Sequence, residues 1–248
     1  MTLGRVAEIW RYPVKGLQGE KLWESRVLTT GISGDHLYVL RAAGSNRILH
    51  SGSHLPSGEE PPGRPAMLEL AARLTGEPEG EHEVAIEASG LKAICSSRNP
   101  GMNRLVSATL GGDVELIRNP RIAASRVRAG RTLHLLATSS LRRMGMVYPE
   151  GDFDVRRFRP NVVIATRQDV DGYVEDEWVG EDLELGSLRL HVEKPNLRCK
   201  VTTMKQQGIK DDPQMLQTIR RENGGNLGVM CTVLAEGMVR VGDGVALA

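Results

Sequence analysis

Cys199 is the residue whose type and surroundings raise the first chemical question in this sequence. It lies in the stretch EKPNLRCKVTT, after a proline turn and before a run of β-forming residues. A cysteine there can be a small buried hydrophobic residue, a nucleophile or a metal ligand. On a strand, Arg198 and Lys200 point away from the face that Cys199 occupies. A cation that favours its thiolate is therefore expected from elsewhere in the fold.

The stretch DVRRFRPNVVI, residues 154–164, is a candidate source of such a cation. As a strand it places Arg157, Arg159 and Asn161 on one face. Two guanidinium groups and an amide in a row suit the binding of an anion. The alternative is an exposed, charged edge strand.

Two further features could bind an anionic group. Lys15 lies in YPVKG, where a lysine precedes a glycine that allows a ligand to approach the backbone. Thr138 and Ser139 begin a short expected helix, whose first N–H groups favour an anion. An ordinary surface lysine and an ordinary helix start explain the same residues.

The composition argues against several classes of protein. Lysine and arginine number 32 against 31 acidic residues, so the net charge of +1 gives no reason to expect binding to nucleic acid or to a membrane surface. Three separated cysteines without CxxC spacing disfavour a disulfide framework, an iron–sulfur centre or a structural zinc site. The histidines show no zinc spacing, and no GxSxG elbow is present. With no signal sequence or membrane-length apolar run, we expect a cytoplasmic protein.

Many short alternating or apolar runs, broken by Gly, Pro and Asp, predict a β-rich α+β protein built on a barrel or sandwich. Three helices are expected, and their start and stop signals place them at residues 99–111, 138–145 and 212–224. Two of them begin with Asn or Asp before Pro, and both of these stop at a glycine. Residues 51–65 and 75–83 are expected to be loops. A soft domain boundary falls near residue 120.

Taken in order, several segments resemble the molybdenum cofactor sulfurase C-terminal (MOSC) domain family. They are YPVKGL, HLLATSSL, FRPNVVI, EDEWVG, LRCKVTT and VRVGDGVAL. The resemblance implies an N-terminal β-barrel-like module at residues 1–120 and a MOSC β-barrel domain at residues 121–248. The early part is similar to the module that precedes MOSC domains in the mitochondrial amidoxime-reducing components and their bacterial relatives.

The resemblance also implies a site. Cys199 matches the cysteine that gives its thiolate to molybdenum. The residues implied to hold the phosphate and ring of the pterin are Lys15, Arg159 and Asn161, with Thr138 and Ser139 also contacting the cofactor and Arg157 beside them in the expected clamp. The family is further associated with pyridoxal phosphate, at family level only.

The expected activity is that of a molybdenum-dependent oxidoreductase that reduces small N-hydroxylated compounds such as amidoximes and hydroxylamines. A separate ferredoxin or flavin-reductase type of protein is expected to supply electrons. The proton donor is not identified by the sequence, in which Asp154 and His191 lie near the relevant motifs. His36 and His50 stand where relatives often carry arginines that face the cofactor.

Three alternatives remain open from the sequence. The protein could carry the molybdenum cofactor without catalysis, or it could transfer sulfur as a persulfide on Cys199. It could also be a degenerate barrel that binds no cofactor, which the replaced arginines favour.

Overall fold

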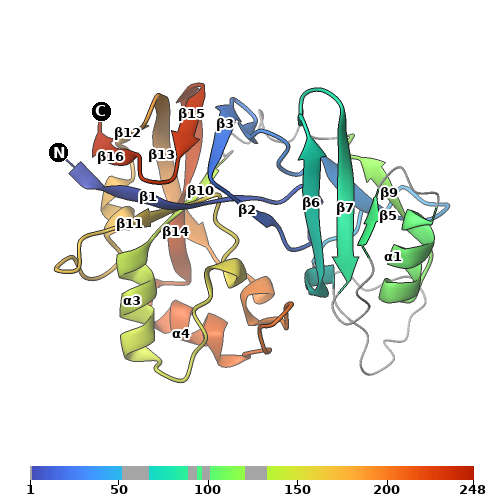
Figure 1. Cartoon of the computed structure of the whole chain (residues 1–248). Helices are drawn as coiled ribbons and strands as arrows, with labels where there is room; N and C mark the ends of the chain where they lie inside the picture. The colour runs from blue at the N-terminus through green and yellow to red at the C-terminus, as the bar shows by residue number, and fades with distance from the viewer. Residues whose placement is uncertain (1, 52–66, 89–93, 97–100, 121–132) are drawn as a thin grey trace.

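The computed structural model describes residues 2–51, 67–88, 94–96, 101–120 and 133–248. Its strands form two bodies that lie side by side, one holding β1 and β10–β16 and the other holding β5–β9 (Figure 1). The expected β-rich α+β barrel is confirmed. No helix in these ranges combines the length and the apolar character that crossing a bilayer requires.

The first body is a closed barrel in which β1 pairs with both β16 and β11. Strands β10 and β11 are parallel, and the other neighbours in the ring are antiparallel. Around the ring the strands are β11 (Val162–Ala165), β10 (Leu133–Ala137), β14 (Asn226–Ala235), β13 (Leu188–Leu197), β12 (Asp182–Leu185), β16 (Gly244–Leu247) and β1 (Thr2–Arg11). Strand β2 (Glu20–Leu22) extends the sheet from β1, and a small sheet joins β15 (Gly237–Arg240), β3 (Glu24–Leu28) and β4 (Gly31–Ile32).

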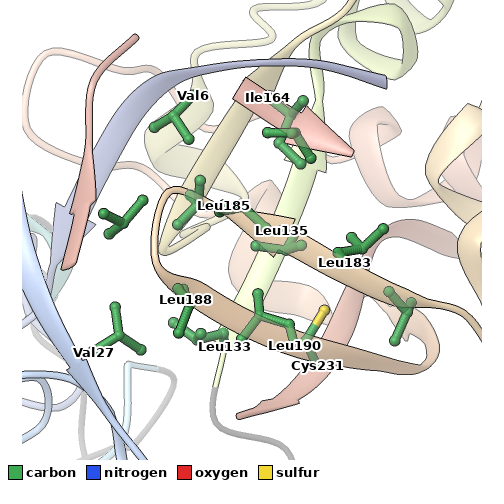
Figure 2. Close-up of a cluster of buried hydrophobic side chains, with 14 of the residues drawn as sticks. Val6, Val27, Leu133, Leu135, Ile164, Leu183, Leu185, Leu188, Leu190 and Cys231 are labelled. Atoms are coloured by element: carbon green, nitrogen blue, oxygen red, sulfur yellow. The ribbon is translucent and has the colours of Figure 1, made fainter. Parts of the chain in front are cut away.

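The barrel encloses an apolar core, which we call the barrel core. Leu183 and Leu185 on β12 and Leu188 and Leu190 on β13 have no exposed surface, because a period of two sends alternate side chains inward. Figure 2 shows these leucines meeting Val6, Val27 and the thiol of Cys231. Cys231 is therefore a buried core residue.

The second body has its own apolar core, which we call the second core. It packs residues of two sheets against one helix. The sheets are β5 (Tyr38–Ala42) with β9 (Val114–Arg118), and β6 (Leu70–Gly76) with β7 (His82–Ala88) and β8 (Ile94–Ser96); the helix is α1 (Met102–Leu110), and the short 3-10 helix η1 (Met67–Glu69) precedes β6.

The boundary expected near residue 120 does not separate these two cores. Val6, Ile9, Val27 and Ile32 pack in the barrel core, although all four lie before residue 120 in the chain. The physical reason is that β1 supplies the strand that closes the barrel between β16 and β11. The second core is built from residues 14–116 and leaves the first strands to the barrel.

The stop signals of two of the three expected helices are confirmed, and so is one start signal. Gly111 ends α1 and Gly224 ends α4 (Gln214–Asn223), both in the left-handed conformation. Asp212 caps α4, since its Oδ1 accepts from the N–H groups of Gln214 and Met215. The start expected at Asn99 lies outside the described residues.

Two other expectations need correction. Helix α3 (Thr138–Val147) continues past the stop expected near Gly145. The loop expected at residues 75–83 is shorter, residues 77–81, because β6 and β7 form a hairpin that turns between Gly76 and His82. Of the loop expected at 51–65, all but Ser51 lies outside the described residues.

Candidate functional site

Cys199 lies just beyond the end of β13, on an exposed bend and not on a strand. Its backbone is extended, with φ −125° and ψ 178°, and it precedes the 3-10 helix η4 (Lys200–Thr203). Its carbonyl oxygen accepts from Thr202, from the backbone N–H at 3.1 Å and from Oγ1 at 2.9 Å. The alternation expected for residues 198–200 therefore does not apply, and the thiol is open to a ligand.

Arg198 is the cation beside Cys199, and the sequence reasoning had pointed it away from the thiol. Its Nη2 donates to the carbonyl of Phe158 at 2.7 Å, while its own N–H donates to Gly225 at 2.8 Å. Burial of the guanidinium lowers the pKa of Arg198 to about 10, and the neighbouring Cys199 and Tyr12 oppose this shift. Its Nε is buried without a hydrogen-bond partner among the described residues.

Arg159 is the second cation of the site. Its guanidinium carbon lies 4.2 Å from the centre of the Tyr12 ring, and Nη1 donates to the carbonyl of Leu17 at 2.7 Å. Burial lowers its pKa, against the influence of Tyr12 and Asp35. Nη2 is buried and has no partner in the described part of the chain. Arg159 and Arg198 thus each retain an unused guanidinium nitrogen.

The backbone at Arg159 explains why a strand prediction failed here. Residues Val155–Arg157 form the 3-10 helix η2, and Arg159 has φ 52°, in the left-handed region. That conformation costs on the order of 1 kcal/mol for a residue with a side chain. The contacts of its guanidinium with Tyr12 and Leu17 hold the side chain in this orientation.

A buried polar network supports the arginine. Asn161 accepts from the His134 N–H at 3.2 Å and donates to the carboxylate of Asp35 at 3.4 Å. Asp35 also accepts from the N–H of Tyr12 at 2.7 Å. The amide of Asn161 is therefore engaged within the protein, where it links His134 of β10 to Asp35 and to the carbonyl of Trp10 on β1.

His134 is buried between two backbone carbonyls. Its ring nitrogens lie 3.3 Å from the oxygens of Arg159 and Leu227. Burial, aided by the charge of Arg198, lowers the pKa of His134 to about 3. The imidazole is therefore neutral at physiological pH.

Lys15 lies close enough to His50 for its charge to act on the imidazole. Burial and the charge of Lys15 both lower the pKa of His50. The backbone N–H of Lys15 donates to Tyr38, and Lys15 stands two residues before Leu17, which holds Arg159. His36 has Nδ1 3.6 Å from Asp35, on the other side of the network.

Arg157 does not belong to this group, which corrects the expected clamp. Only 1 % of its surface is exposed, and its three donors bind the carbonyls of Asp152, Thr202 and Lys210 at 2.8, 3.3 and 2.5 Å. Each of its three nitrogens is engaged with a backbone carbonyl, so it holds backbone segments together.

Thr138 and Ser139 are also separate from the arginines. Strands β10 and β11 run parallel, so His134 and Asn161 mark one end of the pair and Thr138 the other. Four residues of strand separate His134 from Thr138, which is about 13 Å. The hydroxyl of Thr138 already contacts Thr166 and accepts from Arg142.

Asp154 and His191, which lie near the relevant motifs in the sequence, are engaged elsewhere. Asp154 caps η2 and pairs with Arg156 at 2.6 Å. His191 on β13 pairs with Asp182 on β12 at 2.8 Å. Neither has a contact with the described residues that surround Cys199.

The arrangement combines an exposed thiol with two partly buried guanidinium groups that have spare donors. Unpaired buried donors each cost roughly 1–3 kcal/mol, so they are usually satisfied by some partner. A ligand that carries both an anionic group and a centre with affinity for sulfur fits this donor set. The fold and the site thus define a β-barrel protein with an exposed thiol and two arginines that have spare donors.

The comparison with family models gives this class a name. The MOSC domain model matches residues 111–246, more than half of the chain, and the chain belongs to the MOSC domain family. At the level of the family, this domain is associated with the molybdenum cofactor. Nothing in the comparisons supports pyridoxal phosphate.

The fold recurs in the solved structure of a protein of similar length. The YuaD protein from Bacillus subtilis superposes with a TM-score of 0.52 at 15 % identity, covering 99 % of this chain and 94 % of its own. YiiM from Geobacillus stearothermophilus gives 0.38 at 18 % identity, covering 48 % and 55 %. YiiM from Escherichia coli gives 0.36 at 20 % identity, covering 48 % and 54 %. No curated protein matches the chain.

Proposed function

We propose that this protein is a molybdenum-cofactor-dependent oxidoreductase that reduces small N-hydroxylated compounds, such as amidoximes and hydroxylamines. The observation that supports this most is the exposed Cys199 thiol next to Arg198, whose guanidinium in turn interacts with that of Arg159. Each arginine retains a buried nitrogen without a hydrogen-bond partner among the described residues. When bound, the cofactor supplies the two-electron redox chemistry that cleavage of an N–O bond requires.

In this proposal Cys199 supplies a soft thiolate ligand to the metal. Arg159 and Arg198 bind the phosphate through their spare donors, and Lys15 adds a point charge. The stacking of Arg159 on Tyr12 fixes the direction of its fork before any ligand arrives. Asn161 acts indirectly, because its amide is committed to His134 and Asp35.

Two of the expected residues could contact only the far end of a bound cofactor. Thr138 and Ser139 would contact a ligand that reaches about 13 Å along β10 from His134. Electrons would come from a separate ferredoxin or flavin-reductase type of protein, and the substrate would be a small molecule.

A carrier or a sulfur-transfer protein is the second candidate, and the exposure of Cys199 favours it equally. A persulfide on an exposed thiol is accessible to an acceptor. Turnover of benzamidoxime with an artificial reductant distinguishes the two, since a carrier binds cofactor without consuming substrate.

The test is the molybdenum and pterin content per mole of protein, made in a host that synthesises the cofactor. We expect Cys199→Ala to lose molybdenum preferentially, because the pterin phosphate keeps its partners. Arg159→Met should lower pterin and molybdenum together by about tenfold, the effect of removing a charged hydrogen bond.

Cys231→Ala is the matched control, because it removes a thiol that lies in the barrel core. It should retain wild-type contents. Wild-type protein that contains neither molybdenum nor pterin would refute the proposal. Equal molybdenum content in Cys199→Ala and wild type would refute the role of Cys199.

A further inference from the structure

The segment that follows Cys199 is a closed loop, which we call the Cys199 loop (residues 199–212). The N–H of Asp212 donates to Thr203 at 2.8 Å and closes it at the base. Gln206 and Ile209 exchange two backbone hydrogen bonds of 2.9 Å and form a tight turn within it. A shift of this turn is therefore transmitted to the thiol through a short, internally bonded segment.

On the side of the barrel, two arginines bind the backbone of this loop. Arg157 binds the carbonyls of Thr202 and Lys210, and Arg156 donates to Gln207 at 3.0 Å. Both arginines belong to η2, which immediately precedes Phe158 and Arg159. One face of the loop is therefore fixed to the same segment that carries the anion-binding arginine.

The other side of the loop is held by the second body. The side chains of Gln18 and Gln206 are hydrogen-bonded, with Nε2 of Gln18 donating to Oε1 of Gln206. Nearby, the N–H of Gln207 donates to Leu68 at 3.2 Å, and Lys205 pairs with Glu69 at 2.5 Å. These contacts connect the Cys199 loop to η1.

Gln18 is itself fixed to the second body by its backbone. Its N–H donates to Leu70 at 2.8 Å, and its carbonyl accepts from Ala72 at 2.9 Å. Because both contacts lie on β6, the side chain of Gln18 reaches the loop from a rigid base. Leu17, the residue before it, accepts the hydrogen bond from Arg159.

The two amides are poorly satisfied for their burial. Gln18 is 3 % exposed and Gln206 is 1 % exposed, yet Oε1 of Gln18 and Nε2 of Gln206 have no partner among the described residues. If both amides are rotated so that oxygen and nitrogen exchange places, one acceptor and one donor still remain without a partner. One hydrogen bond offset by two unpaired groups adds little to stability. Its main effect is geometric, because it fixes the orientation of the Cys199 loop relative to β6.

We propose that Gln18 and Gln206 are positioning residues for Cys199, through which the second body sets the place of the thiol relative to Arg198 and Arg159. The inference deepens the proposed function, because a metal ligand must be held in place. It can nevertheless be tested on the thiol alone, in protein without cofactor.

The experiment compares Gln18→Met, Gln206→Met and the double variant with wild type. Methionine is close to glutamine in size and has no amide. The rate of alkylation of Cys199 by iodoacetamide is followed as a function of pH, by mass spectrometry of the peptide that contains it. Gln207→Met is the matched control, because the described contacts of Gln207 run through its backbone.

We expect both single variants to unfold at lower denaturant concentration, because each leaves one amide unpaired. The double variant should recover towards wild type, since no amide remains to be satisfied. All three should nevertheless shift the pH profile of Cys199 alkylation and change its rate several-fold, whereas Gln207→Met should do neither.

A pH profile of Cys199 that matches wild type in all three folded variants would overturn the proposal. Should a methionine variant fail to fold, Gln18→Asn keeps the polarity and withdraws the amide by one methylene, and the same profile is measured. A wild-type protein that binds no molybdenum would sink the proposed function and leave this comparison intact.

Discussion

The exposed thiol of Cys199 lies near side chains whose donor atoms are buried. The thiol lies on a surface bend, whereas the Nε of Arg198 and the Nη2 of Arg159 are removed from water. Charged donors in such a place are stronger partners for an anion than exposed lysines, because water competes less. The chemistry of the site therefore depends on residues that an accessible-surface view would miss.

Glu175 is a second residue whose environment changes its chemistry. It is fully buried in the 3-10 helix η3 (Val174–Trp178), where it accepts from Ser140 Oγ at 2.5 Å and from the N–H of Ala137 at 3.4 Å. Burial raises its pKa to about 7, and the bond from Ser140 opposes that shift. This carboxyl group joins the end of β10 to the first turn of α3.

Glu175→Gln should change how stability depends on pH. The folded pKa lies above the ordinary value of 4.5, so the contribution of Glu175 is present below pH 4.5 and is lost as pH rises through about 7. Glutamine resembles the neutral acid and does not titrate, so its contribution to stability does not change over this pH range. The free energy of unfolding of the variant, relative to wild type, should therefore increase by about 3 kcal/mol between those limits.

Urea unfolding at several pH values measures this difference. His134 shifts stability in the opposite direction, because its lowered pKa costs stability as pH falls below 6.5, but it is present in both proteins and cancels. Glu177→Gln, at an exposed position of the same turn, is the control. Parallel pH curves for Glu175→Gln and wild type would contradict the assignment.

At the scale of elements, β14 and β10 approach each other at one glycine. Gly228 has φ 79°, and a Cβ there would overlap both His134 Nε2 and the carbonyl oxygen of Leu135. Only glycine combines this conformation with this approach. The close packing places the imidazole of His134 between the carbonyls of Arg159 and Leu227.

Gly228→Ala should therefore destabilise the protein by about 3 kcal/mol, from a clash with backbone and a strained φ together. Gly145→Ala is the matched control, because Gly145 lies inside α3 with open space around it. It should stabilise by roughly 0.5–1 kcal/mol through helix propensity. Chemical unfolding measures the free energy of unfolding of both variants. An unchanged value for Gly228→Ala would show that the strands can move apart without loss of stability.

The elements also show which features a sequence can reveal. The Asp212 cap and the Gly224 stop of α4 are local and were predicted, because their hydrogen bonds span only three and five residues. The strand expected at residues 154–164 was wrong at its centre. There, contacts with Tyr12 and Leu17 stabilise a left-handed residue, and no local pattern records a contact made across more than 140 positions.

The candidate site was partly predictable for the same reason. Cys199 and Arg159 came from motifs whose order resembles a known family. Arg198 was missed because alternation was assumed where the strand had already ended at Leu197. Thr138 was grouped with the arginines because the sequence does not state that β10 and β11 run parallel.

At the scale of the whole molecule, two cores share one chain without dividing it in half. The barrel core takes residues from both ends, including Val6 and Val245. The second core lies between these contributions in sequence. The region matched by the family model, 111–246, therefore lacks the strand β1 that closes the barrel.

A fragment of residues 121–248 should not fold cooperatively. Without β1, the edges of β11 and β16 are unpaired, and the barrel core is open to water where Val6 and Ile9 belong. Circular dichroism across a urea gradient measures the transition, with the full chain as the control. A fragment that unfolds with the steepness of the intact protein would show that the barrel closes without its first strand.

The pairing of β1 with β16 also has a consequence for biosynthesis. Thr2 lies opposite Ala246, so β1 leaves the ribosome long before the strand that it pairs with has been made. Contacts this distant in sequence form slowly, because a long loop must close before they contribute. During translation β1 therefore has an unpaired edge and exposed apolar side chains until its partner strand is made. A chaperone that covers this strand during synthesis should raise the yield of active protein more than one that acts after release.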